Sequence, residues 1–101
     1  MILTTENIKQ IIEGYFSKKP VKKVWLFGSY ACGDADDDSD VDVLVDIEYT
    51  PGIGSDYFKW NGELEQKLNK RVDIVSMGWE NKHIKSFIDK DKFLIYERQD
   101  R

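Results

Sequence analysis

Residues 24–45 read VWLFGSYACGDADDDSDVDVLV, and this stretch decides the fold. Its first four residues are a continuous apolar run, typical of a strand that is covered on both faces. The run ends in the pair Gly28-Ser29, and a second apolar run opens with an Asp-x-Asp pair, Asp40 and Asp42. The sequence therefore predicts two strands of one sheet, with a Gly-Ser turn and two carboxylates at their ends.

Gly28 and Ser29 are predicted to bind phosphate. Glycine lets the main chain approach an anion closely, and a helix that starts after the turn would present N–H groups to it. The Ser29 hydroxyl could add a further donor. An isolated Gly-Ser pair is more often a plain turn, and the acidic pair that follows is what favours a phosphate site here.

Asp40 and Asp42 are predicted to bind a metal ion. Side chains at i and i+2 of a strand point to the same face, roughly 6.6 Å apart along the chain. Hard cations prefer oxygen ligands, and a cation removes the repulsion between two close carboxylates. The alternative is a charged strand edge. A metal beside a triphosphate would indicate phosphoryl or nucleotidyl transfer.

Asp73, between two apolar residues of a third predicted strand, is the candidate for a third site carboxylate. It would share the metal and accept the proton of an attacking hydroxyl. The alternative is a structural aspartate that pairs with Arg71.

Hydrophobic periodicity predicts an α/β (α+β) fold, with a small mixed sheet of about four strands and three or four helices. One domain is expected over residues 1–101. The predicted helices cover about 5–18 and 55–69, with a short third helix around 84–88, and the predicted strands cover 21–27, 40–47, 71–76 and 93–96, the last at an edge.

The charge distribution favours a cation site over a nucleic-acid surface. The net charge is −4, but six aspartates fall between residues 34 and 42, so the rest of the chain is slightly basic. No basic stripe supports direct nucleic-acid binding. A calcium hand is also unsuitable, because its sixth position would be Ser39 and its twelfth Val45.

A cytoplasmic location is expected. No apolar run is long enough to span a membrane, no signal peptide is apparent, and the single cysteine fits a reducing compartment. That residue, Cys32, is expected to be a small packing residue, and the single histidine, His83, to be exposed.

The Gly28-Ser29 turn, the Asp40/Asp42 pair and Asp73 together resemble the DNA polymerase beta-like nucleotidyltransferases. The short chain is most similar to the minimal nucleotidyltransferases, which are antitoxin partners of HEPN toxins. The resemblance extends from about Val21 to Tyr96. It implies the nucleotidyltransferase fold, ATP as substrate and Mg²⁺ as cofactor.

By the same resemblance, Gly28 and Ser29 would hold the β- and γ-phosphates, and Asp40 and Asp42 would bind the metal. Asp73 would complete a second metal site and draw the proton from the acceptor. The acceptor would be a tyrosine of a HEPN toxin, which would receive AMP and could form a hetero-oligomer with this chain.

One departure from the family pattern keeps a second function open. Close relatives usually read Gly-Ser-x-Ala-Arg-Gly, and Cys32 stands where the arginine is expected. The alternative is therefore a weak or inactive antitoxin, which would neutralise its toxin by binding alone.

Overall fold

The computed structural model describes residues 4–33, 35–36, 38–48, 51, 53–76 and 92–98. The elements follow the order α1 (Thr5–Phe16), β1 (Val21–Phe27), α2 (Ser29–Cys32), β2 (Val41–Ile47), α3 (Ile53–Leu68), β3 (Val72–Ser76) and β4 (Phe93–Glu97). The predicted α/β class is confirmed. The predicted short helix around residues 84–88 lies outside the described residues.

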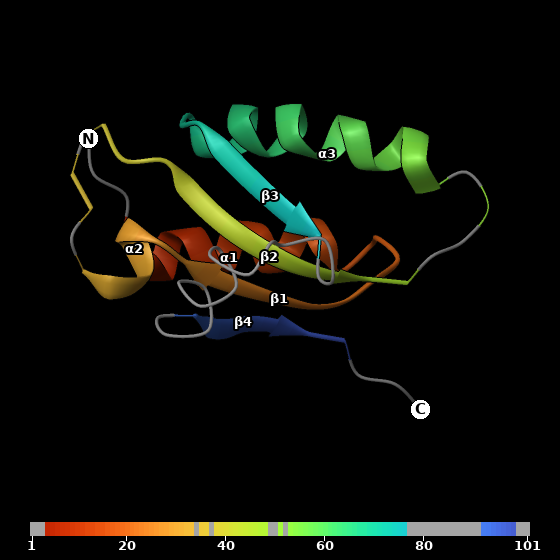
Figure 1. The fold of residues 1–101 in the computed structure, drawn as a ribbon, viewed down its shortest axis with the longest axis horizontal. Coiled ribbons are helices and arrows are strands. Elements are labelled where there is room, and N and C mark those ends of the chain that lie inside the picture. Colours follow the sequence, from red (N-terminus) through yellow and green to blue (C-terminus); the bar gives the residue numbers. More distant parts are fainter. Residues whose placement is uncertain are drawn as a thin grey trace.

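The four strands form one mixed sheet in the order β3-β2-β1-β4 (Figure 1). Strand β1 is antiparallel to both β2 and β4, whereas β2 and β3 are parallel. The first apolar run therefore lies at the centre of the sheet, and β4 is an edge strand, as the sequence predicts. The second edge is β3, which carries Asp73.

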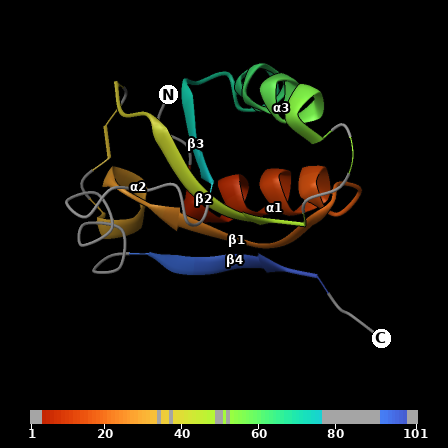
Figure 2. The same ribbon diagram turned by 45° about the vertical axis from the view of Figure 1, so that its right-hand side comes forward.

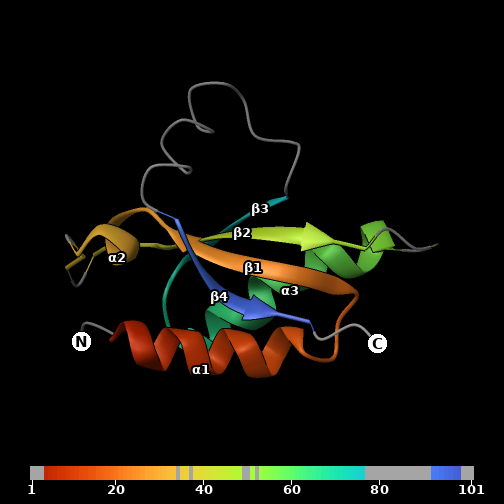
Figure 3. The same ribbon diagram turned by 90° about the horizontal axis from the view of Figure 1, so that it is seen from below.

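Helices α1 and α3 cover the same face of the sheet (Figures 2 and 3). Each presents an apolar stripe at i, i+4 and i+8, the spacing of a helix that buries one side. The stripes consist of Ile8, Ile12 and Phe16 on α1 and Trp60, Leu64 and Leu68 on α3, all at most 2% exposed. Among the helices described, none has the length and apolar character that crossing a membrane requires.

The opposite face of the sheet carries a smaller apolar cluster. Phe27 and Leu44 are buried there, with Trp25 and Val75 packed against them. Neighbouring residues on the same strands, such as Leu26 and Val43, belong to the main core, because strand side chains alternate between faces. The central strands thus bury residues on both faces.

Aromatic rings join α1 to α3. The Trp60 ring packs edge-to-face against Phe16, with the ring centres 5.6 Å apart, and tilts against Tyr57 at 5.7 Å. Nearby, the Tyr15 hydroxyl donates a hydrogen bond to the Glu63 carboxylate. Burial, and then this carboxylate, raise the pKa of Tyr15 above its usual range.

We expect Trp60→Ala to lower the free energy of unfolding by about 3–5 kcal/mol, because it removes a fully buried ring between two helices. Phe58→Ala on the same helix is the matched control, since Phe58 is 83% exposed. Its effect should stay within about 0.5 kcal/mol. Urea unfolding followed by circular dichroism measures both. Equal effects would contradict this assignment of the core.

Candidate active site

The predicted site residues gather at one end of the sheet. Gly28 follows β1 and caps α2, which begins at Ser29. Asp42 in β2 lies opposite Phe27 of β1 on one side and opposite Asp73 of β3 on the other. Asp40 directly precedes β2, so it stands just outside the strand predicted to contain it. The pairing register thus brings together residues from three segments.

Gly28 is in direct contact with the Asp42 side chain. A Cβ atom added at Gly28 would lie 2.3 Å from Oδ2 of Asp42, far inside van der Waals contact. The backbone of Gly28 also has φ 77° and ψ −153°, a conformation that is essentially restricted to glycine. Both the available space and the dihedral angles therefore require glycine at this position. The predicted phosphate turn and the predicted metal ligand are parts of one structure.

The chain passes from strand to helix within this single residue. The Gly28 carbonyl accepts hydrogen bonds from the N–H groups of Ala31, at 3.0 Å, and Cys32, at 3.1 Å. The first N–H groups of a helix have no acceptor within it, and they can face an anion. Phosphate binding at this turn stays a prediction, which the short helix α2 neither contradicts nor tests.

The surroundings of Asp42 disfavour its charged form. Its side chain is half-buried, while Asp40 and Asp73 are exposed. Burial first, then the Asp73 charge, then the Asp40 charge, raise the pKa of Asp42 from 3.8 to about 6. In the part of the chain that the structure describes, no lysine or arginine forms a salt bridge with any of the three. A bound cation would relieve this repulsion.

The three carboxylates do not form a complete metal cage. Among the described residues, no group of three His, Cys, Asp or Glu side chains is arranged to hold a metal ion by itself. Mg²⁺ is usually bound by one or two carboxylates together with substrate phosphates and water. Asp42, whose charged form is disfavoured, contacts the Gly-Ser turn. This arrangement is compatible with Mg²⁺ binding in which a nucleotide would supply the missing ligands.

Two features of this region differ from the sequence analysis or are absent from it. Cys32 is exposed, so its expected role as a packing residue is wrong. Lys70 lies beside the segment that leads to Asp40, through a contact with Ser39. No sequence signal indicated this contact, because it joins residues far apart in the chain. His83 lies outside the described residues.

A groove of about 620 Å³ lies elsewhere on the molecule, between α1 and β4. Its lining includes Glu13 and Gly14 of α1 and Leu94 and Tyr96 of β4, and it contains none of the candidate site residues. The groove therefore contributes nothing to the chemistry considered for the carboxylates.

The contact between Gly28 and Asp42 can be measured by substitution. Gly33→Ala is the matched control, because Gly33 also has positive φ, at 85°, but a Cβ there meets nothing within 4 Å. It should cost about 1–2 kcal/mol of stability from backbone strain alone. Gly28→Ala should cost more, because its backbone conformation is less accessible to alanine and because its Cβ would meet Asp42. The part due to Asp42 is the coupling energy: in an Asp42→Ala background the cost of Gly28→Ala should fall by about 1–3 kcal/mol. An equal cost of Gly28→Ala in both backgrounds would contradict the contact.

Asp42 should make stability depend on pH. The pKa of Asp42 is about 6 in the folded protein, whereas the ordinary value is 3.8. Between these two pH values the folded state therefore keeps a proton that the unfolded chain has released. Stability should therefore fall as pH rises from about 4 to about 6, and the loss should persist above that range. Solvent screens the charges around a half-buried group, so without metal or nucleotide we expect Asp42→Asn to be more stable than wild type by only about 1–2 kcal/mol at pH 8 and to match it near pH 4. Thermal unfolding at several pH values measures this, and a pH-independent difference would contradict it.

Comparison with known proteins agrees with this geometry. The polymerase beta nucleotidyltransferase family model matches residues 6–101. The protein adenylyltransferase MntA of Thermococcus cleftensis is 37% identical over 78 residues, which are 73% of this chain and 78% of that protein.

Two solved structures have the same fold. A toxin–antitoxin complex with AMP-PNP aligns with a TM-score of 0.70 at 22% identity, over 94% of this chain and 75% of the other. A complex of a tri-AMPylated Shewanella oneidensis HEPN toxin with its MNT antitoxin aligns with a TM-score of 0.66 at 16% identity, over 93% and 73%. These two structures show the fold, and the family model together with the sequence match shows that this chain belongs to the polymerase beta nucleotidyltransferase family.

Proposed function

We propose that this chain is a Mg²⁺-dependent protein adenylyltransferase that transfers AMP from ATP to a tyrosine of a partner HEPN toxin and acts as its antitoxin. The observation that carries the proposal is the contact between Gly28 and the half-buried Asp42 carboxylate. It places the Gly-Ser turn, which we propose binds phosphate, directly beside a carboxylate whose charged form is disfavoured by burial and by neighbouring carboxylates. The names of the relatives supply the choice of AMP and of a protein acceptor.

We assign a different role to each of the site residues. Gly28 and Ser29 would hold the terminal phosphates through the main chain and the serine hydroxyl. The half-buried Asp42 and the exposed Asp40 would hold the metal. Bound Mg²⁺ would neutralise phosphate charge and stabilise the oxygens of the displacement.

Asp73 is suited to the acceptor side of the reaction. It is exposed and belongs to an edge strand, so a large substrate can reach it. Asp73 would accept the proton of the tyrosine hydroxyl as that oxygen attacks the α-phosphorus of ATP. The bond between the α-phosphorus and the bridging oxygen breaks, AMP stays on the tyrosine, and pyrophosphate leaves.

The experiment mixes this chain with a candidate HEPN toxin, ATP and Mg²⁺ and follows the mass of the toxin. Wild type should add AMP, and Asp73→Asn should slow the addition by about 10²–10⁴-fold because it lacks the proton acceptor. Asp46→Asn, near the far end of β2, is the matched control and should react as wild type does. Co-purification with the toxin should be unchanged in both variants.

The same experiment tests the alternative of neutralisation by binding alone, which the replacement of the family arginine by Cys32 favours. In that case the toxin would lose its activity when mixed with an equal amount of this chain, and the mass of the toxin would not change. That outcome would contradict the enzymatic proposal and leave the antitoxin role in place.

A further inference from the structure

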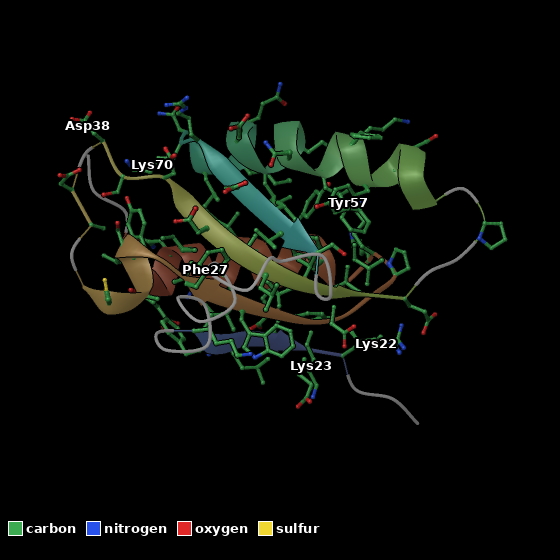
Figure 4. All side chains as sticks on the ribbon, in the orientation of Figure 1. Lys22, Lys23, Phe27, Asp38, Tyr57 and Lys70 are labelled. Carbon is green, nitrogen blue, oxygen red and sulfur yellow. The ribbon has the colours of Figure 1, made fainter. Side chains whose placement is uncertain are left out.

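Lys70 connects two parts of the candidate site. It lies between α3 and β3, and its ammonium group donates to the Ser39 carbonyl at 3.4 Å. The same group lies 5.9 Å from the centre of the Tyr30 ring, on α2. Figure 4 shows Lys70 and Asp38 at the same end of the sheet. One side chain therefore contacts both the segment that leads into Asp40 and the helix that follows Gly28.

Ser39 is the centre of a compact turn. Its hydroxyl accepts from the Asp36 N–H at 2.8 Å, and its own N–H donates to the Asp36 carbonyl at 3.1 Å. The Asp36 carboxylate accepts from the Asp38 N–H at 2.9 Å. These bonds give the turn an internal shape but do not fix where it lies.

Ala35, directly before Asp36, packs against the main core, and two described hydrogen bonds join the turn itself to the rest of the protein. One is the hydrogen bond from Lys70 to Ser39, and the other is the backbone bond from the Val41 N–H to the Arg71 carbonyl at 2.9 Å. Asp40 lies between Ser39 and Val41 in the chain. Its position therefore depends on both contacts, and Lys70 supplies the one made by a side chain.

Tyr30 gives Lys70 a rigid support. Its side chain is 5% exposed and belongs to the main core, and its buried hydroxyl has no hydrogen-bond partner in the described part of the chain. The ring is thus held by packing, and a cation can rest on an aromatic face.

We propose that Lys70 is a positioning residue of the active site, which holds the chain at Ser39 close to α2 so that the adjacent Asp40 can share a metal ion with Asp42. The proposal rests on the proposed function for the role of the metal. The contacts that support it are those of the protein alone, so it can be tested both without and with nucleotide.

The first measurement needs no ligand. Lys70→Met keeps the length of the side chain but removes its charge and its donors, and Lys67→Met in the last turn of α3 is the matched control. Amide hydrogen exchange by NMR should be about two- to tenfold faster at Ser39 and Val41 in Lys70→Met, the scale of one lost hydrogen bond. Lys70→Arg should restore wild-type rates, because a guanidinium group can also donate and stack. Wild-type exchange in Lys70→Met would overturn the proposal.

The second measurement is calorimetric titration with ATP in the presence and absence of Mg²⁺. Lys70→Met should weaken Mg–ATP binding about two- to tenfold while leaving metal-free ATP binding unchanged, a difference that general destabilisation would not produce. If wild type binds Mg–ATP and Lys70→Met binds it equally well, this proposal alone fails. If wild type binds no Mg–ATP, the proposed function fails, and the role of Lys70 in the site fails with it.

Discussion

The half-buried carboxylate of Asp42, held against a main chain that has no room for a side chain, is the constraint on which the rest of the site depends. It requires glycine at position 28, in a backbone conformation that other residues avoid. It also leaves a negative charge poorly hydrated beside two others, which raises the pKa of Asp42 to about 6. A carboxylate that is perturbed by burial and by like charges is a candidate for a functional site, and the metal role proposed for Asp42 would explain its unfavourable surroundings.

The sheet explains how distant residues come together. Antiparallel pairing of β1 with β2 brings the end of β1 to Asp42, and parallel pairing of β2 with β3 brings Asp73 to its other side. Helices α1 and α3 cover one face of the sheet through a continuous apolar core (Figure 3). The rigid elements thus carry the carboxylates, and the edge position of β3 leaves Asp73 accessible.

The sequence predicted these elements because their patterns are strong. Val24–Phe27 and Val43–Val45 are continuous apolar runs, and the helices bury residues at regular spacing. The ends of the helices differ slightly from the prediction. Helix α3 begins at Ile53, before the predicted start at about residue 55. Gly54 is typical of a loop in the sequence, but it is part of the first helical turn. Helix α1 ends at Phe16, where the Ser17 hydroxyl donates to the Gly14 carbonyl.

The candidate site was predictable in part, for a similar reason. Residue types and spacing indicated Gly28, Asp40 and Asp42, because these three residues lie close together in the sequence. The exposure of Cys32 and the contact of Lys70 with Ser39 depend on the packing of separate elements, and no local pattern encodes that packing. The pKa of Asp42 likewise depends on Asp73, which approaches only after the sheet has formed.

The parallel register of β2 and β3 has a consequence for folding. Asp42 and Asp73 face each other across two strands that are joined through the whole of α3, so their pairing closes a long loop. Contacts of this kind form slowly, whereas the β1–β2 contact with Gly28 closes a shorter one. A folding intermediate that contains only the antiparallel pair would hold the turn and Asp42 without the third carboxylate. By loop length, Asp73 would join Gly28 and Asp42 after the antiparallel pair has formed, and the pairing of β1 with β4, which closes a still longer loop, would follow.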